Sequence, residues 1–328
     1  MHEPLDAAPD PPLILLGPQR LQPVLRPQLD RLAERGQLGD EPSGPVVAVT
    51  AGWQEREGEN DELATHLERE VIDLRLHGRT EEVFAADPEL AAAHRRRQDR
   101  LQELQRLYRY RLDFALEPAR ELMRRPGDDP LLVAEREAAI DAVRELDRRH
   151  LENVEAEHRR FLETWSPAAR PEVVRHRDEL AQQIEGAAAI AIAGGHVAVL
   201  ANRLRLFDLV PLLRRRPILA WSAGAMVLAR RIVLFHDSPP QGAGNPDVLD
   251  QGLGLHDLVP LPHARHRLRL EDPARVALFA RRFAPERCTP LDEGMALERH
   301  ADGAWREVAS AYRLDAGGEV VPLEERAP

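Results

Sequence analysis

The chain has 328 residues, enough for one large domain or two ordinary ones, each with a substantial core. Hydrophobic residues make up 43% and charged residues 31%, as in a globular protein, and the net charge of −11 argues against nucleic acid or an anionic membrane as a partner. Every one of the 45 basic residues is arginine, which excludes Schiff-base, Ser–Lys and Walker-type lysine chemistry.

Cysteine content and hydropathy bear on the compartment. The single cysteine, Cys288, permits no internal disulfide and no multi-cysteine zinc site, as expected in a reducing compartment. Residues 1–12 are acidic and proline-rich rather than basic and then apolar. No run approaches the ~18 apolar residues of a membrane span. The sequence therefore predicts a cytoplasmic protein.

Apolar runs alternate with helical patterns in the first part of the chain. Strands are predicted at 13–17, 46–50 and 72–76. A helix with Leu21, Leu25, Leu29 and Leu32 on one face follows the first strand, and a helix over 61–71 follows the second. Continuous apolar strands separated by helices are typical of a parallel sheet covered on both faces.

The pattern changes at about residue 80, where glycine almost vanishes. Charged residues recur at helical spacing over 91–125 and 131–165, with a Pro-Gly-Asp-Asp-Pro break at 126–130 between them. We expect a long helical hairpin, kinked at Pro118, and a short returning helix over 171–183. The hairpin would pack on the domain or form a homodimer, which we favour over a lid.

Strand and helix patterns resume at 187–193 and continue to the end of the chain. They include an apolar strand before Ser222, a helix over 276–283, and late strands at 291–297 and 320–323. The predicted fold is α/β, a doubly wound, mostly parallel, flavodoxin-like sheet with a long helical insertion. The predicted parts are 1–79 and 187–328 for the α/β domain and 80–186 for the insertion.

Ser222 follows the apolar strand directly and begins a helix. Ala220-Trp221-Ser222-Ala223-Gly224 is a small-x-Ser-x-small pattern, as in a nucleophile elbow, where the strand–helix turn is too sharp for large neighbours. Such a turn holds the hydroxyl beside backbone N–H groups that can bind an oxyanion. The alternative is a tight turn that needs small residues only for packing.

A serine nucleophile needs a base and an acceptor that orients it. The histidines after Ser222 are His236, His256, His263, His266 and His300. His263 has the best position, because it ends an apolar strand and so lies at the edge that carries Ser222. Asp237 ends the strand after the Ser222 helix and is the first choice of orienting acid, with Asp247, Asp250 and Asp257 as competitors.

Gly194 and Gly195 directly follow the neighbouring strand. A backbone N–H there can pair with that of Ala223 as an oxyanion hole. The pair does not fit the G-x-G-x-x-G pattern of dinucleotide sites, and no metal site is expected.

Four motifs occur in an order that resembles the serine peptidase family of dipeptidase E and cyanophycinase. They are Gly194-Gly195, Trp221–Ala225, Gly252–Leu255 followed by Pro262-His263, and Leu291–Leu297. The resemblance covers 187–325 well and 13–76 loosely, and leaves out the insertion. It implies a fold similar to class I glutamine amidotransferases, with serine in place of cysteine at the elbow.

The resemblance also implies residue roles. Ser222 would be the nucleophile, His263 the general base and Asp237 the acid, in a reaction without a cofactor. His196 stands where the family often has Asn or Asp, and Ala264 where phenylalanine usually follows the histidine. Arginines near the histidine bind an acidic group in this family, which suggests substrate binding by Arg265, Arg267, Arg269 and His196.

The resulting hypothesis is a serine hydrolase that cleaves a small peptide or isopeptide beside an acidic residue. The alternative is a catalytically silent amidotransferase-like domain whose helical arm mediates assembly or signalling. Glutamine amidotransfer is disfavoured, because the elbow has no cysteine and Cys288 lies far away in the sequence.

Overall fold

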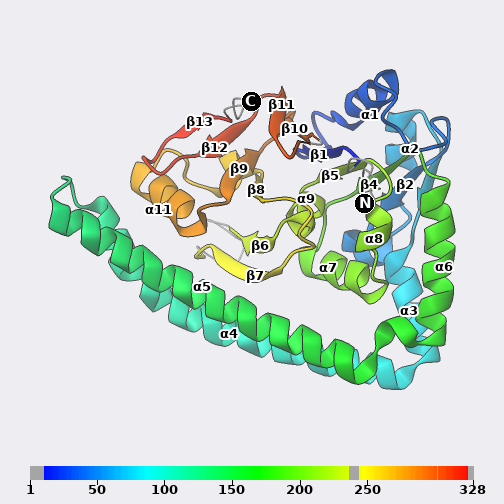
Figure 1. Cartoon of the computed structure of the whole chain (residues 1–328), viewed down its shortest axis with the longest axis horizontal. Helices are drawn as coiled ribbons and strands as arrows, with labels where there is room; N and C mark the ends of the chain where they lie inside the picture. Colours follow the sequence, from blue (N-terminus) through cyan, green and yellow to red (C-terminus); the bar gives the residue numbers. More distant parts are fainter. Residues whose placement is uncertain (1–10, 236–243, 301, 324–328) are drawn as a thin grey trace, which may run out of the picture.

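A seven-stranded sheet lies at the centre of the computed structural model, which describes residues 11–235, 244–300 and 302–323 (Figure 1). In spatial order its strands are β11 (Trp305–Ala309), β10 (Ala296–Arg299), β1 (Leu13–Leu16), β5 (Ile218–Trp221), β4 (Ala189–Ile192), β2 (Val46–Val49) and β3 (Val71–Asp73). The five from β1 to β3 are parallel, and β10 and β11 are antiparallel additions at one edge. The expected mostly parallel sheet is confirmed.

The strand order also agrees with the flavodoxin-like expectation. Read from the far edge, β3-β2-β4-β5-β1 is the flavodoxin order 2-1-3-4-5, with the first strand of this chain in the fifth place. The order reverses between β2 and β4, so the crevice at their carboxyl ends is where such folds bind ligands.

Helices cover both faces of the sheet. Alternate strand residues point to opposite sides, so Ile14 and Leu16 pack against one set of helices and Leu13 and Leu15 against another. The first set is α1 (Leu25–Glu34) and α2 (Asp61–Leu67). The second includes α3 (Leu76–Ala86), α6 (Pro171–Glu185), α7 (Val197–Leu206), α8 (Val210–Leu213) and α9 (Ala223–Leu228).

Shorter elements complete the carboxyl-terminal part. Three two-stranded sheets pair β6 (Arg231–Leu234) with β7 (Asp247–Gln251), β8 (Leu258–Pro262) with β9 (Arg287–Leu291), and β12 (Tyr312–Leu314) with β13 (Val320–Pro322). The accompanying helices are α10 (Ala264–Arg267) and α11 (Pro273–Phe283), and the short 3-10 turns η1 (Ala51–Arg56) and η2 (Pro167–Ala169) lie earlier in the chain.

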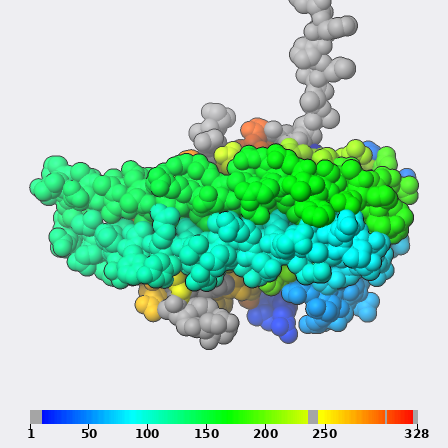
Figure 2. All heavy atoms as spheres, turned by 90° about the horizontal axis from the view of Figure 1, so that it is seen from below, coloured from blue at the N-terminus to red at the C-terminus, as the bar shows by residue number. Residues whose placement is uncertain are grey.

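The predicted helical hairpin is confirmed. Helices α4 (Pro88–Arg124) and α5 (Pro130–Trp165) lie side by side along one face of the molecule (Figures 1 and 2). Asp87 and Asp129 cap their N-termini, each followed by a proline that needs no N–H partner. The first helix continues through Pro118 as one element.

A buried ion pair holds the hairpin to the body. Arg282 of α11 donates from Nε to Asp147 Oδ2 of α5 at 2.7 Å and from Nη2 to Oδ1 at 2.8 Å, and both residues are 2% exposed. Tyr108 of α4 donates to the same carboxylate at 2.6 Å and accepts from Arg282 at 3.0 Å. Burial alone would lower the pKa of Arg282, but Asp147 raises it. One network thus joins both hairpin helices to α11.

Further polar contacts dock the hairpin on β7 and α7. Arg109 donates to Asp247 Oδ2 at 2.6 Å, and Arg205 donates to Asp250 Oδ2 at 2.5 Å, while His158 of α5 lies 3.1 Å from Asp250 Oδ1. These acids, which the sequence suggested as orienting groups, therefore serve the packing of the hairpin.

Three expectations need correction. Leu21 is 72% exposed and lies before α1, because the Gln19 side chain accepts from the backbone N–H groups of Val24 and Leu25 and starts the helix there. The helix over 61–71 ends at Leu67, and Val71 already belongs to β3. The strand at 291–297 is two strands, because Gly294 (φ +77°) turns the chain between β9 and β10.

We predict that Arg282→Met destabilises the protein by about 3–5 kcal/mol, because it leaves the Asp147 carboxylate buried without its cation. Tyr108→Phe should cost less, about 1–2 kcal/mol, through lost hydrogen bonds. The free energy of unfolding in urea measures both effects.

Arg148→Gln on the exposed side of α5 is the matched control and should leave that free energy unchanged. An Arg282→Met protein as stable as the wild type would contradict a docking role for the ion pair.

Candidate active site

Four loops meet at the carboxyl ends of the parallel strands. Gly17 follows β1, Gly52 lies in η1 after β2, Gly194 follows β4 and Ser222 follows β5. Since β2, β4, β5 and β1 are adjacent and parallel, these residues share one edge of the sheet, and we call this edge the rim.

Ser222 has an unusual backbone conformation. Its φ of +52° and ψ of −123° lie outside the regions that residues with a side chain normally adopt. The residue joins the end of β5 directly to α9, whose residues are all buried. Ser222 itself remains partly exposed, so the strained turn holds a hydroxyl at the surface of the rim.

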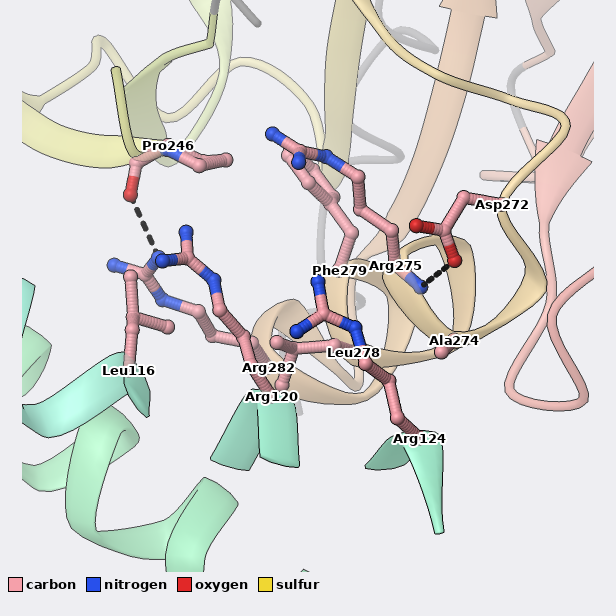
Figure 3. Close-up of a pocket in the computed structure, with 10 residues that line it drawn as sticks. All are labelled: Leu116, Arg120, Arg124, Pro246, Asp272, Ala274, Arg275, Leu278, Phe279 and Arg282. Carbon is pink, nitrogen blue, oxygen red and sulfur yellow. Dashed lines mark hydrogen bonds between the residues drawn. The ribbon is translucent and has the colours of Figure 1, made fainter. Parts of the chain in front are cut away.

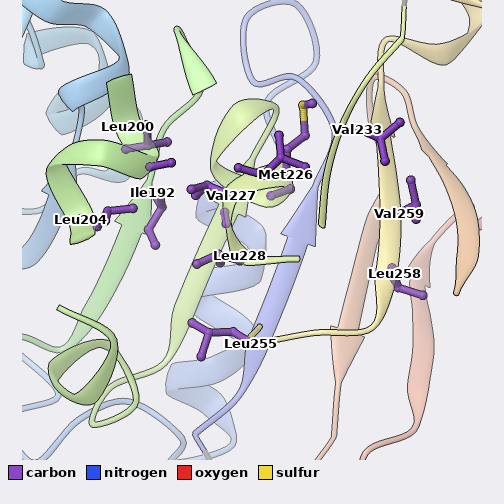
Figure 4. Packing of buried hydrophobic residues seen from close by; sticks show 14 of the residues in the cluster. Ile192, Leu200, Leu204, Met226, Val227, Leu228, Val233, Leu255, Leu258 and Val259 are labelled. Atoms are coloured by element: carbon purple, nitrogen blue, oxygen red, sulfur yellow. The ribbon is translucent and has the colours of Figure 1, made fainter. Parts of the chain in front are cut away.

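Close packing explains the small residues around Ser222. A Cβ on Gly194 would lie 2.8 Å from Ser222 Cβ, and a Cβ on Gly224 would lie 2.3 Å from the Ile192 carbonyl oxygen. Behind this turn, Met226 and Val227 of α9 pack among residues of α7, β6 and β8 (Figure 4). The predicted need for a small residue two positions after Ser222 is confirmed at Gly224, and Gly194 adds a second position that has no room for a side chain.

The two amides predicted to bind an oxyanion lie on adjacent loops. The position of a Gly194 Cβ is 3.6 Å from Ala223 N, so the β4 loop touches the first amide of α9. Gly195 has φ of +107° and packs against Gly52, where any side chain would come within 2.3 Å of the carbonyl oxygen. Only glycine fits this crossing of two loops.

His196 has a structural partner. Its ring Nδ1 accepts from Val199 N at 3.3 Å and caps α7, while its backbone N–H donates to Gly52 O at 2.8 Å. The ring is exposed beside the rim.

His263 is connected to the rim by a chain of backbone contacts. It follows β8, adopts φ of +59°, and donates its N–H to Leu291 O at 3.1 Å. The next residue, Asp292, packs its carbonyl against Gly17, where a Cβ would come within 1.8 Å. Gly17 in turn follows Leu16, the register partner of Trp221. Among the described residues, no hydrogen bond joins Ser222 Oγ to the His263 ring.

The sequence offered four other histidines as a general base, and the structure describes three of them. His256 is buried, with Nε2 2.9 Å from Ala225 O and Nδ1 accepting from Leu258 N, and burial lowers its pKa to about 4. His300 lies beside Glu298 and Arg306 at the β10–β11 edge of the sheet, and His266 is exposed on α10. His236 lies outside the described residues.

Two acids that the sequence analysis did not assign lie near His263. Burial and Arg267 lower the pKa of His263, while the carboxylates of Asp292 and Glu293 act in the opposite direction. Asp292 Oδ1 accepts from Arg265 N at 3.1 Å, and burial raises the pKa of this carboxyl. Asp292 and Glu293 both belong to the Leu291–Leu297 motif, and that motif was the sequence signal that could have identified them.

The predicted acid Asp237 lies outside the described residues. Of its competitors, Asp247 and Asp250 bind the hairpin, and Asp257 accepts from Trp305 Nε1 at 2.9 Å.

The predicted substrate arginines lie on and just after the one-turn helix α10. Arg265 is exposed, with Nε 3.7 Å from Asp292 Oδ2. Arg267 is half-buried, and burial lowers its pKa. Arg269 lines a cavity with Arg120 and Arg124 instead.

No group of three or more His, Cys, Asp or Glu side chains within residues 11–235, 244–300 and 302–323 is arranged to hold a metal ion. No helix in those ranges combines the length and apolarity needed to cross a membrane.

The charges around His263 lead to a prediction. Arg267→Gln should raise the pKa of the His263 imidazole toward its ordinary value, because a nearby cation disfavours protonation. Glu293→Gln should lower it further. The imidazole C–H signals in an NMR titration, assigned with His263→Ala, give both values. Unchanged titration in Arg267→Gln would place the guanidinium away from the ring.

Residues 147–306 match the model of Peptidase family S51, and no curated protein matches the sequence. Among solved structures, a peptidase from an acI-B1 Actinobacterium is 14% identical over 96% of this chain and 98% of that chain, with a TM-score of 0.48. A putative peptidase E protein from Listeria monocytogenes EGD-e is 15% identical over 45% of this chain and 65% of that chain, with a TM-score of 0.27. Residues 147–306, just under half of the chain, thus resemble Peptidase family S51, the dipeptidase E family that the motifs predicted, and the match supports a serine-type peptidase of that kind.

Proposed function

We propose that this peptidase cleaves a small peptide or isopeptide through an acyl-enzyme formed on Ser222. The observation that carries the proposal is the strained backbone of Ser222 at the β5–α9 turn, with φ of +52° and ψ of −123°. A nucleophile elbow needs this conformation to expose its hydroxyl above the sheet. A turn needed only for packing has no reason to strain a residue with a side chain.

In the proposed reaction His263 removes the proton as Ser222 Oγ attacks the scissile carbonyl. The N–H groups of Ala223 and Gly195 bind the resulting oxyanion. His263 then protonates the leaving amine. In the second half of the reaction His263 removes a proton from water, which attacks the acyl-enzyme and releases the acyl group from Ser222. The lowered pKa of His263 keeps its imidazole neutral, and therefore basic, at neutral pH. No step requires a cofactor.

Three acids are candidates for the third member of the triad. Asp237 remains the prediction from the sequence. Glu293 and Asp292 are alternatives among the described residues, because both carboxylates act on His263. Asp292 already accepts from Arg265 N and has an Oδ2 without a hydrogen bond, while Glu293 is partly exposed at the Gly17 loop. Either would stabilise the imidazolium formed during attack.

The substrate class rests on the cations next to the base. Arg265 and Arg267 lie on the single turn that follows His263. A guanidinium there can bind a carboxylate of the substrate through two parallel hydrogen bonds. We therefore propose a preference for an acidic residue beside the scissile bond, and place the reaction in the cytoplasm, as the lone, buried Cys288 suits a reducing compartment.

A second candidate role is assembly through the hairpin, with or without catalysis. Leu107, Tyr110 and Phe114 recur at helical spacing on α4 and are 49%, 68% and 63% exposed. The rings of Tyr110 and Phe114 lie 5.4 Å apart, so the three form one apolar stripe. Such a stripe favours a homodimer formed by two hairpins.

We predict that a fluorophosphonate probe labels the wild-type protein, and that Ser222→Ala abolishes labelling. His263→Ala should slow labelling by about 10²–10⁴-fold, because the hydroxyl loses its base. Gel fluorescence over time measures the rates. Asp237→Asn and Glu293→Gln, compared in the same assay, identify the orienting acid as the one whose loss has the larger effect.

Ser310→Ala and His266→Ala are controls for an exposed hydroxyl and an exposed imidazole, and should label like the wild type. A wild type that is folded by circular dichroism yet never labelled would favour the silent assembly domain.

A separate prediction concerns Gly194. Gly194→Ala should reduce labelling at least tenfold with a smaller change in stability, because the new Cβ would contact Ser222 Cβ at 2.8 Å and displace the hydroxyl. Gly186→Ala is the control, since its nearest contact, at 3.8 Å, leaves room for the methyl group. Equal labelling of Gly194→Ala and wild type would mean that this contact does not position Ser222.

A further inference from the structure

A second residue of the rim shares the strained backbone conformation of Ser222. Gln54, in η1 after β2, has φ of +58° and ψ of −120°, against +52° and −123° for Ser222. These are the dihedral angles of the first central position of a type II′ turn, where glycine is the usual residue. A side chain at such a position costs stability, and strain of this kind is concentrated at sites that bind ligands.

The loop that carries Gln54 is fixed against the proposed oxyanion loop. Gly52 O accepts the backbone N–H of His196 at 2.8 Å, and a Cβ on Gly52 would lie 2.5 Å from the Gly194 carbonyl oxygen. A Cβ on Gly194 would in turn lie 2.8 Å from Ser222 Cβ. Gln54 is therefore two residues away from a contact that leads directly to the hydroxyl.

The side chain of Gln54 has no partner of its own in the described part of the chain. Its amide group makes no hydrogen bond there, and the residue is half-buried. The backbone carbonyl accepts from Glu57 N at 2.9 Å, and the neighbouring Trp53 packs on the cluster that includes α1 and α2. The donor and the acceptor of the Gln54 amide are thus both available to a ligand.

The hollows beside the hairpin do not serve a peptide that reaches Ser222. The cavity between α4 and α11 has a volume of about 40 Å³, enough for roughly three water molecules, and no residue of the rim lines it (Figure 3). A hollow of about 640 Å³ next to it is lined by α4, α11 and the segments before β7 and α11. The substrate must therefore lie along the rim itself.

The order of the strands gives the substrate a direction along the rim. The carboxyl ends follow one another as β2, β4, β5 and β1, with Gln54 after β2 and Ser222 after β5. His263 is joined to the rim on the β1 side, through the Gly17 loop. In the proposed reaction His263 protonates the leaving amine, so the leaving group lies on that side. The acyl part of the substrate then extends over β4 toward β2.

The spacing of the strands indicates which group reaches Gln54. Neighbouring strands are about 4.8 Å apart, so β2 lies about 10 Å from β5, and an extended peptide advances about 3.3 Å per residue. The glutamine side chain covers part of this distance. We infer that Gln54 binds the peptide unit that precedes the residue at the scissile bond, donating from Nε2 to its carbonyl oxygen and accepting its N–H at Oε1. This inference rests on the proposed peptidase function.

Protection of Ser222 from the fluorophosphonate probe tests the inference. N-acetyl-Asp-Ala contains this peptide unit, and succinyl-Ala is the same molecule without it. In the wild type the first should halve the labelling rate at about a tenfold lower concentration than the second, because it gains two hydrogen bonds. Gln54→Gly and Gln54→Ala should both remove this difference, each protein being compared with its own rate without ligand. Glu55→Ala, at the exposed next position, should keep it.

Thermal unfolding separates binding from a structural role. Glycine is not strained at φ of +58°, so Gln54→Gly should unfold at the wild-type temperature or roughly 2–4 °C above it. A less stable Gln54→Gly would assign the strained turn to the fold and overturn the inference.

The labelling results distinguish this inference from the proposed function. A labelled wild type that neither ligand protects, or that both protect equally, would overturn the inference and leave the proposed function intact. The same holds if Gln54→Gly keeps the tenfold difference. A folded wild type that is never labelled would contradict the proposed function, and the inference with it.

Discussion

The buried pair of Arg282 and Asp147 determines how the two parts of the molecule fit together. The two long helices bury an apolar stripe that includes Leu112, Ile140 and Val143, whereas their outer ion pairs are exposed and contribute little to stability. The inner network is different, because Arg282 and Asp147 are 2% exposed and Tyr108 completes their hydrogen bonds. Either charge would be costly to bury in that position without its partner. The network therefore favours one position of the hairpin on α11.

At the rim, close backbone packing has the same organising effect. Loops after β2, β4, β5 and β1 come so near one another that Gly52, Gly194, Gly195 and Gly17 have no room for a Cβ, and each crossing places a loop relative to the next. Ser222 is held in a strained conformation at the centre of this arrangement. The series continues through Asp292 and Leu291 to His263, so the residue proposed as the base, although it follows a strand of a separate small sheet, is still tied to the edge that carries the hydroxyl.

Much of this architecture could be predicted from local patterns, because apolar runs and small residues act at short range. The strands of the parallel sheet, the turn at Ser222 and the Pro-Gly break of the hairpin are all of this kind. What escaped prediction depends on distant partners. Asp247 and Asp250 resembled orienting acids, yet they bind Arg109 and Arg205, which no local pattern reveals. Asp292 and Glu293 were recognised as part of a motif, but their closeness to His263 results from the pairing of β8 with β9. The start of α1 depends on a cap from the side chain of Gln19.

The place of β1 in the sheet also has a consequence for the order of folding. Leu13 pairs with Ile218 on one side and Arg299 on the other, so the first strand of the chain finds both neighbours only after most of the sequence has been made. The hairpin, whose helices are consecutive, can assemble much earlier. During synthesis the apolar segment Leu-Ile-Leu-Leu therefore remains unpaired until its neighbouring strands have been made. Exposed segments of this kind bind chaperones or aggregate. The edge that holds Ser222 is complete only when this strand has been inserted, so catalytic competence would be among the last properties that the folding chain acquires.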